Sequence, residues 1–375
     1  MARVAIVGAG WAGASTAHSL VASGVDVEIF EKTSVSGGHS RFEVLGDVVY
    51  EPNGAHIFHT SDEQIATFVQ RHGLTRPFEH VVSTEVYLTD EDDESVLLSW
   101  PPQIEELKNL PIWPQVSSEL DLLPETAQGD DFESYVISMM GRTLYNIFIR
   151  EYTIKQWGVD PSELSSRFAP KRVELRTDGY RRLFRDRWEF FNADGINAVI
   201  ESVIAGIPLH VDTEISIHDL EDLERTFDAV VITAPLDTFA DRAGELAWRG
   251  ISMKSELISV DSPSGTVTKG YVINHPSARV PYTRTVETKH ATGQSINATV
   301  VSEEYPGAPH RHYPVATPDG RYERLNAKLQ QEILASTGLP LYFCGRLANY
   351  LYINQDEAIR QGFDCADAIL EDLTP

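Results

Sequence analysis

The residues with the clearest chemistry lie near the beginning of the chain, in a glycine-rich turn between a short apolar strand and a helix. The spacing is G-x-G-x-x-G, with glycines at Gly8, Gly10 and Gly13. Gly8 permits a tight turn, Gly10 leaves room for a pyrophosphate against the backbone, and Gly13 lets helix and strand pack closely. The free N–H groups and positive dipole end of the following helix favour phosphate. The turn therefore predicts a dinucleotide site.

An acidic residue after the next strand supports this interpretation. The apolar run 25–30 predicts a second strand, and Glu31 follows it about 20 residues after the turn, where a carboxylate can accept hydrogen bonds from a ribose. Lys32 and Gly38 are further cofactor-binding candidates. The pair Gly37 and Gly38 lets the backbone lie against a flat ligand, with a surface turn as the alternative. FAD and NAD both use this unit, so the motif alone does not choose between them.

Two histidines three residues apart stand in the block N-G-A-H-I-F-H-T at 53–60. His56 and His59 could bind a metal, but no third or fourth ligand stands near them in the sequence. We therefore expect no metal, and interpret both side chains as the hydrogen-bonding lining of a ligand site. Residues 61–71 predict a helix, with Ser61 and Gln64 as its capping box.

Basic residues gather between positions 167 and 187 of an otherwise acidic chain. They are Arg167, Lys171, Arg172, Arg176, Arg181, Arg182, Arg185 and Arg187. Guanidinium groups match phosphate oxygens bidentately, so the cluster favours a diphosphate ligand. A run of charge is also typical of a solvated face paired to glutamates. We expect that explanation for about half of the cluster, and only one or two of its residues at a ligand.

The composition excludes several classes of function. The chain has 375 residues, 42% of them apolar, with 56 acidic and 31 basic residues and a formal net charge of −25. This balance argues against nucleic acid or an anionic membrane surface as a partner. There is no run of eighteen apolar residues, so we expect no membrane-spanning helix. The first strand leaves no room for a signal peptide before it, and the two cysteines are too few for a disulfide scaffold. We expect a cytoplasmic protein without membrane insertion.

Later segments return to the first sheet. Apolar strands are predicted at 228–233 and 341–343, and the second is followed by Gly345 and Arg346 at the start of another helix, a second place where backbone can meet phosphate. The nucleotide domain is therefore expected to be discontinuous. Between its pieces, residues 131–152 have one continuous helical period, and residues 251–315 have the pattern of antiparallel strands.

Several blocks, in order from end to end, resemble one family, the flavin-dependent UDP-galactopyranose mutases. They are 8–13, 37–38, 54–60 (G-A-H-I-F-H-T), 152–158 (Y-T-I-K-Q-W-G), 281–284 (P-Y-T-R) with Glu287, Lys289 and His290, 313–315, and 345–347 with Tyr350 and Tyr352. The resemblance implies an α/β fold in three parts. A discontinuous Rossmann-like FAD-binding domain spans 1–78, 193–245 and 330–375. A helical domain is inserted at 101–170, and an antiparallel β-sheet substrate domain spans 79–100, 171–192 and 246–329.

The resemblance also implies an activity. The cofactor would be FAD, active when reduced, and the reaction the interconversion of pyranose and furanose forms of UDP-galactose or a related UDP or dTDP sugar, without net redox change. In the family, N5 of the reduced flavin attacks the anomeric carbon and displaces the nucleotide diphosphate; the sugar opens through an iminium and recloses with the other ring size. An external reductant (NADPH or a reductase) and a homodimer are implied as well.

The motif match carries site residues over one by one. Arg284 and Arg172 would face the leaving diphosphate, and His59 the flavin ring. The implied substrate-binding residues are Phe148, Tyr152, Trp157, Tyr180, Tyr313, Tyr352 and Asn354. The implied cofactor-binding residues are Gly8, Gly10, Gly13, Glu31, Lys32, Gly38, His56 and Arg346.

Two departures from the family pattern leave alternatives open. Asn354 stands where the family usually has Asp, and segment 173–192 is shorter and more basic than the tyrosine-rich mobile loop that closes over substrate, with Tyr180 as a candidate for one of its roles. The resemblance therefore indicates the type of reaction more directly than it indicates the sugar or the base of the substrate. A FAD-dependent amine-oxidase-like oxidoreductase remains an alternative, although amine substrates do not call for an arginine cluster. A flavin-bearing binding protein without turnover is the third.

Overall fold

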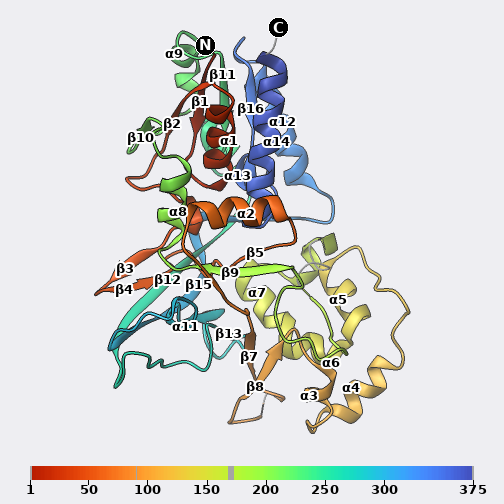
Figure 1. Cartoon of the computed structure of the whole chain (residues 1–375). Helices are drawn as coiled ribbons and strands as arrows, with labels where there is room; N and C mark the ends of the chain where they lie inside the picture. Colours follow the sequence, from red (N-terminus) through yellow and green to blue (C-terminus); the bar gives the residue numbers. More distant parts are fainter. Residues whose placement is uncertain (1, 90, 168–172, 374–375) are drawn as a thin grey trace.

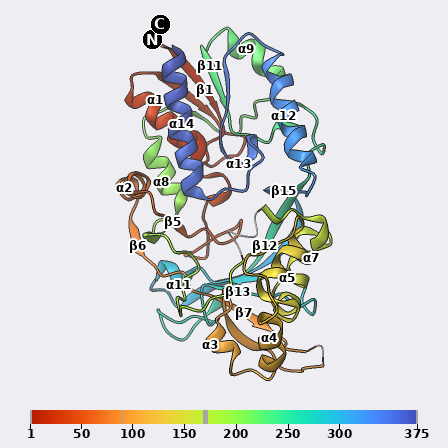
Figure 2. The same cartoon turned by 90° about the vertical axis from the view of Figure 1, so that its right-hand side faces the viewer.

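The computed structural model describes residues 2–89, 91–167 and 173–373. Figures 1 and 2 show two regions stacked end to end, with both chain termini at the far end of one of them. The region with the termini contains a parallel sheet between helices. The other contains a mixed sheet with a group of helices beside it. Among the described helices, none is both long and apolar enough to cross a membrane.

The parallel sheet is assembled from three distant parts of the chain. Its strand order is β10-β2-β1-β11-β16, and every pair is parallel. The strands are β1 (Arg3–Val7), β2 (Asp26–Phe30), β10 (Leu209–His210), β11 (Ala229–Ile232) and β16 (Leu341–Phe343). β1 and β11 are apolar on both faces, as expected for central strands of a parallel sheet. The predicted return of the later segments to the first sheet is confirmed.

Alternate residues of the central strands enter two separate hydrophobic cores. Val4 and Ile6 belong to one core, and Ala5 and Val7 to the other. The first face is covered by α1 (Trp11–Ala22), α2 (Glu63–His72), α8 (Ile196–Val203) and α14 (Gln355–Leu373), and the second by α9 (Leu220–Glu224), α10 (Leu236–Phe239) and α12 (Arg321–Leu334). The short helix α13 (Gly345–Ala348) follows β16, so its start lies at the carboxyl end of the sheet, where ligands of doubly wound folds bind.

The second sheet has the order β12-β15-β14-β13-β7-β8. Its strands are β7 (Val82–Val86), β8 (Val96–Trp100), β12 (Trp248–Ser259), β13 (Val272–Asn274), β14 (Arg284–Val286) and β15 (Ala298–Pro314), and α11 (Lys289–Thr292) follows β14. The β7–β13 pair is parallel, so the sheet expected to be antiparallel is mixed. The long β15 extends from this sheet toward the parallel one (Figure 2).

Two small sheets lie alongside. One joins β5 (Phe58–Thr60), β9 (Trp188–Asn192) and β6 (Thr75–Pro77), and the other pairs β3 (Glu43–Leu45) with β4 (Val48–Tyr50). The helix after β5 begins differently from the prediction. The N-cap of α2 is Asp62, whose side chain accepts from the N–H groups of Gln64 and Ile65, so the predicted capping box at Ser61 is wrong. Ser61 instead donates to Asp186.

The helical group consists of α3 (Ile104–Leu107), α4 (Trp113–Leu120), α5 (Phe132–Met140), α6 (Arg142–Leu144), a π-helix (η2, Tyr145–Arg150) and α7 (Glu151–Trp157). The single helix predicted over 131–152 is interrupted because Gly141, with φ 83°, ends α5. The π-helix then adds a wider turn before α7, a feature often found at functional sites. Phe148 lies within the π-helix, and Tyr152 follows it in α7.

Candidate active site

The glycine turn forms one end of a cavity of about 1010 Å³. Gly8 has φ 108°, and a Cβ on Gly13 would lie 2.0 Å from the Gly8 carbonyl oxygen, so only glycine fits these two positions. Glu31 accepts hydrogen bonds from the N–H groups of Ala9 and Thr33, both at 2.9 Å, and so holds the turn in place. The cavity is lined by seven of the eight predicted cofactor-binding residues, namely Gly8, Gly10, Glu31, Lys32, Gly38, His56 and Arg346. Gly13 lies behind the turn, as its packing role requires.

The same cavity offers polar atoms that fit a large polar ligand. Among the described residues, buried atoms of Asn53, Thr238, Arg311 and His312 have no hydrogen-bond partner in the protein, and all four residues line the cavity. Leaving such groups unpaired costs free energy, so a ligand that pairs with them is stabilised. Donors and acceptors both occur in this set, which fits a dinucleotide.

Three histidines on this cavity are held neutral. Burial, with the positive charge of Arg346 nearby, lowers the pKa of His56 to about 4 and that of His312 to about 3; burial also lowers the pKa of His39. His39 and His312 stack with ring centroids 4.3 Å apart. Within the described chain, no cluster of three or more histidine, cysteine or acidic side chains could hold a metal ion.

A second cavity, of about 310 Å³, lies among the helical group, the mixed sheet and residues 346–355 of the region that contains the parallel sheet. His56, Arg346, Asn354 and Gln355 line both cavities, so ligands in the two would meet at these residues. The second cavity is lined by eight of the ten predicted catalytic and substrate-binding residues, namely His59, Phe148, Tyr152, Trp157, Arg284, Tyr313, Tyr352 and Asn354.

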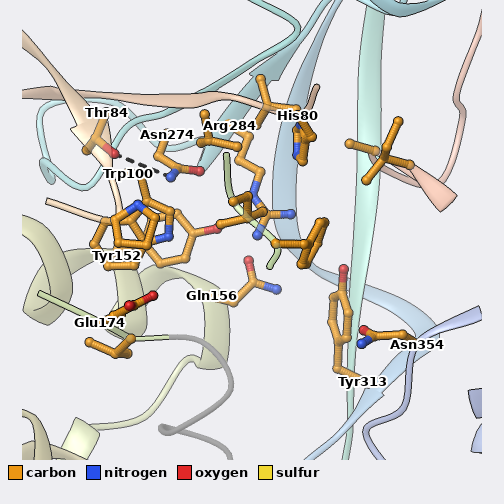
Figure 3. Close-up of a pocket in the computed structure, with 18 of the residues that line it drawn as sticks. His80, Thr84, Trp100, Tyr152, Gln156, Glu174, Asn274, Arg284, Tyr313 and Asn354 are labelled. Atoms are coloured by element: carbon orange, nitrogen blue, oxygen red, sulfur yellow. Dashed lines mark hydrogen bonds between the residues drawn. The ribbon is translucent and has the colours of Figure 1, made fainter. Parts of the chain in front are cut away.

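Arg284 supplies a permanent positive charge to the second cavity (Figure 3). Its Nη1 lies 3.5 Å from Oε2 of Glu304, whose side chain is fully buried on the neighbouring strand β15. Burial alone would lower the pKa of Arg284, but the attraction of Glu304 raises it well above the ordinary value. The guanidinium also lies over the ring of Tyr152, 5.9 Å from its centroid.

Aromatic side chains from three elements surround this cation. Tyr152 and Trp157 come from α7, Tyr313 from the end of β15, and Tyr352 from the segment before α14. The rings of Tyr313 and Tyr352 lie 5.5 Å apart, and Arg346 lies over both, 5.7 and 5.4 Å from their centroids. Burial raises the pKa of Tyr152 above its ordinary value, so its hydroxyl stays protonated and can donate. The arrangement combines hydroxyl donors with two guanidinium groups, which suits phosphate oxygens.

The helical group is fastened to the mixed sheet next to this cavity. Lys155 of α7 donates to the carbonyl oxygens of residues 275, 277, 280 and 282, at 2.6 to 3.1 Å. Arg249 of β12 donates to the carbonyls of Gln156 and Lys155 at the end of α7. The loop before Arg284 and the helix that carries Tyr152 are therefore held at a fixed spacing.

One predicted residue, Arg172, lies outside the described residues, and another is not brought into the site. Tyr180 does not line either cavity: its hydroxyl donates to the Phe184 carbonyl, and its ring packs against Arg176, Arg182 and Arg185. Phe184 and Leu183 of the same segment line the cavity instead. The arginine cluster is thus largely structural in the described part, since Arg176, Arg181, Arg182, Arg185 and Arg187 all pair with acidic residues.

Sequence reasoning missed several lining residues. Trp100, Glu174 and Asn274 face the second cavity, and Asn274 donates to Thr84 at 3.4 Å (Figure 3). They are isolated polar or aromatic residues on strands or loops, and only the fold brings them to the cavity.

Comparison with known proteins identifies relatives of the chain. The sequence model of the UDP-galactopyranose mutase family matches residues 147–352, more than half of the chain, and a model of an NAD(P)-binding Rossmann-like domain matches residues 6–71. The chain is 27% identical to a probable UDP-galactopyranose mutase of Klebsiella pneumoniae, covering 99% of this chain and 95% of that protein. It is 25% identical to the dTDP-fucopyranose mutase of Escherichia coli, covering 99% of both.

A solved structure shares the fold. A crystal structure of reduced UDP-galactopyranose mutase matches with a TM-score of 0.78 at 16% identity, over 100% of this chain and 97% of that one. The family match covers Phe148, the Y-T-I-K-Q-W-G block, Arg284 and the tyrosines of the second cavity. On this evidence, the chain belongs to the UDP-galactopyranose mutase family and is a nucleotide-sugar mutase, an isomerase.

Proposed function

We propose that the protein binds FAD in the larger cavity and interconverts the pyranose and furanose forms of a nucleotide-diphosphate sugar in the smaller one. The observation that carries this proposal is the junction of the two cavities at His56, Arg346, Asn354 and Gln355, with the cation of Arg284 in the smaller cavity. When bound and reduced, the flavin would supply a nucleophilic nitrogen for the anomeric carbon.

The diphosphate is the leaving group, and the chain must stabilise the charge that it gains. We assign this role to Arg284, with the hydroxyls of Tyr313 and Tyr352. In a buried site, preorganised cations and donors stabilise developing charge much more than water does. The Glu304 carboxylate keeps Arg284 charged and fixed in position. Arg172, the second predicted diphosphate ligand, stays a prediction.

The opposite end of the smaller cavity suits a nucleoside. Trp100, Phe132 and Phe148 provide apolar surface to this cavity. In Figure 3, Trp100 and Tyr152 lie on the side of the cavity away from Tyr313 and Asn354. The Escherichia coli relative is named for a dTDP sugar and the Klebsiella pneumoniae relative for a UDP sugar. We propose one of these two nucleotide classes as the substrate.

An amine-oxidase-like oxidoreductase is the competing function. Its substrate would carry a positive charge, and the guanidinium groups of Arg284 and Arg346 in the cavity would repel an ammonium group. The external reductant (NADPH or a reductase), the homodimer, the cytoplasmic location and the three domain boundaries remain proposals from the resemblance.

The test is the turnover of the FAD-loaded, dithionite-reduced protein on UDP-galactopyranose and dTDP-fucopyranose, read by chromatography. The Arg284→Ala variant should lose on the order of 10²-fold or more in kcat and keep its FAD. Because this change leaves Glu304 buried without its cation, the double variant Arg284→Ala/Glu304→Gln serves as a matched control for folding. Undiminished turnover in the double variant would contradict the assignment. Hydrogen peroxide production from simple amines in air would favour the oxidase instead.

A further inference from the structure

The segment 173–187 contains a carboxylate that contacts a predicted catalytic residue without lining the cavity itself. We propose that Asp186 is a positioning residue, which holds His59 as the tautomer protonated on Nδ1 and leaves Nε2 as the nitrogen that serves the cavity. The effect of Asp186 on catalysis rests on the proposed function. The assignment of the His59 tautomer does not depend on that function.

The contact is direct and well defined. Nδ1 of His59 lies 2.7 Å from Oδ2 of Asp186, and Oδ1 of the same carboxylate accepts from the Ser61 hydroxyl at 2.7 Å. The hydrogen bond from His59 holds the pKa of Asp186 below its ordinary value, against the effect of burial, so the carboxylate is ionised at neutral pH. An ionised carboxylate can only accept, hence the proton between the two groups belongs to Nδ1.

The other edge of the imidazole ring is available to a ligand. His59 lines the smaller cavity, and within the described residues its Nε2 makes no hydrogen bond to the protein. Phe184 stacks on one face of the ring, with centroids 3.5 Å apart and planes 11° from parallel. The backbone of His59 is fixed in β5, paired with Glu189 of β9. Asp186 therefore holds Nδ1 of His59, Phe184 covers one face of the ring, and β9 fixes the backbone. Nε2 is the ring nitrogen left for the cavity.

The segment that carries Asp186 is itself tied down. The guanidinium of Arg176 is buried and donates to the carbonyls of Tyr180, Arg182 and Leu183, and to the Glu174 carboxylate at 2.9 Å. Further bonds connect it to its surroundings, from the Leu183 N–H to the His80 carbonyl and from Gln103 to the Tyr180 carbonyl. Asp186 therefore stands on a preorganised segment, so that its geometry toward His59 exists before any ligand binds.

A fixed tautomer matters for the chemistry proposed here. Opening and reclosing a sugar ring moves protons on and off oxygen, and a histidine does this only with the correct nitrogen toward the reacting group. Asp356, Glu189 and His80 are further ionisable groups near His59. Among Asp186 and these three, Asp186 is the one with a hydrogen bond to the ring.

The experiment combines two readouts on the FAD-loaded enzyme. Nitrogen-15 NMR of histidine-labelled protein reports the tautomer of His59, with His59→Gln used to assign its signals. We expect a protonated Nδ1 in the unchanged protein and a mixture or reversal in Asp186→Asn. We also expect kcat to fall about 10- to 100-fold with little change in KM, as for carboxylates that orient functional histidines elsewhere. Ser61→Ala, which keeps the His59 contact, is the matched control and should change neither readout.

The outcomes separate this proposal from the proposed function. A neutral His59 that carries its proton on Nε2 and not on Nδ1 in the unchanged protein overturns the proposal whether or not Asp186→Asn folds. If Asp186→Asn loses the Nδ1-protonated tautomer of His59 but keeps an unchanged kcat, the positioning role of Asp186 in catalysis is overturned. If no nucleotide sugar is converted, the proposed function fails, and the NMR result still decides whether Asp186 sets the tautomer.

Discussion

Replacing Glu51 by glutamine removes a buried charge while keeping the shape of the side chain. Glu51 is 1% exposed and accepts hydrogen bonds from the N–H of His56 at 2.6 Å, the hydroxyl of Tyr271 at 2.5 Å and the hydroxyl of Thr288 at 3.1 Å. It thereby holds the backbone of His56, which lines both cavities. None of these partners is a cation, so burial dominates and raises the pKa of Glu51 from 4.5 to about 7.

The magnitude follows from this shift in pKa. A factor of ten in an ionisation constant corresponds to about 1.4 kcal/mol, so the folded state disfavours the charged carboxylate by roughly 3 kcal/mol. Because the folded pKa is raised, the contribution to stability is fully present below pH 4.5 and is lost as the pH rises through 7. Between pH 5 and pH 8 the loss amounts to about 2.5 kcal/mol. Glutamine cannot ionise, so the Glu51→Gln variant should not show this loss of stability between pH 5 and pH 8.

The assay is urea unfolding of the FAD-loaded protein and of Glu51→Gln at pH 5 and pH 8, followed by tryptophan fluorescence. Other titrating groups are common to both proteins and cancel in the difference. We expect the free energy of unfolding of Glu51→Gln to gain about 2.5 kcal/mol relative to the unchanged protein between the two pH values. A difference that is independent of pH, or that changes in the opposite sense, would refute the reasoning.

The remaining predictions concern the fastening of the site and the cofactor turn. Lys155→Met leaves four carbonyl groups without their donor, and should lower the free energy of unfolding by on the order of 3 kcal/mol and reduce turnover. Lys108→Met, at a half-exposed residue whose ammonium pairs with Glu105, is the control, and equal effects of the two substitutions would contradict this prediction. Gly13→Ala places a Cβ 2.0 Å from the Gly8 oxygen, and should weaken FAD binding at least about tenfold in a fluorescence titration. Gly270→Ala, at a glycine with open space around it and no positive φ, is the control and should bind FAD normally.

Much of the nucleotide region could be predicted because its signals are local. The glycine turn, the strand that ends before Glu31 and the strand before Gly345 are each explained by residues close in sequence. The interruption of the helix over 131–152 was missed because apolar residues recur at helical spacing on both sides of Gly141, and an isolated glycine is tolerated within a helical pattern. The parallel β7–β13 pair was missed because parallel pairing joins distant segments and leaves no local pattern.

At the site, the resemblance predicted the residues that face the cavities better than those that support them. The charges that fix the active groups, Glu304 beside Arg284 and Asp186 beside His59, come from segments far away in the chain. Nothing in the sequence distinguishes these two carboxylates from the other acidic residues of so acidic a chain. For the arginine cluster, pairing with acidic residues was expected for about half of its members. In the described residues the pairing is more extensive, as with Arg176 and Arg185, because the fold brings carboxylates to most of these side chains.

The most direct test of the central claim is the dependence of product formation on the redox state of the flavin. Purified FAD-loaded protein is incubated anaerobically with UDP-galactopyranose or dTDP-fucopyranose, with and without dithionite, and the nucleotide sugars are separated by chromatography. We expect a furanose product from one of the two sugars with the reduced protein and none with the oxidised protein. Equal conversion in both states, or no conversion of either sugar by the reduced protein, would contradict it.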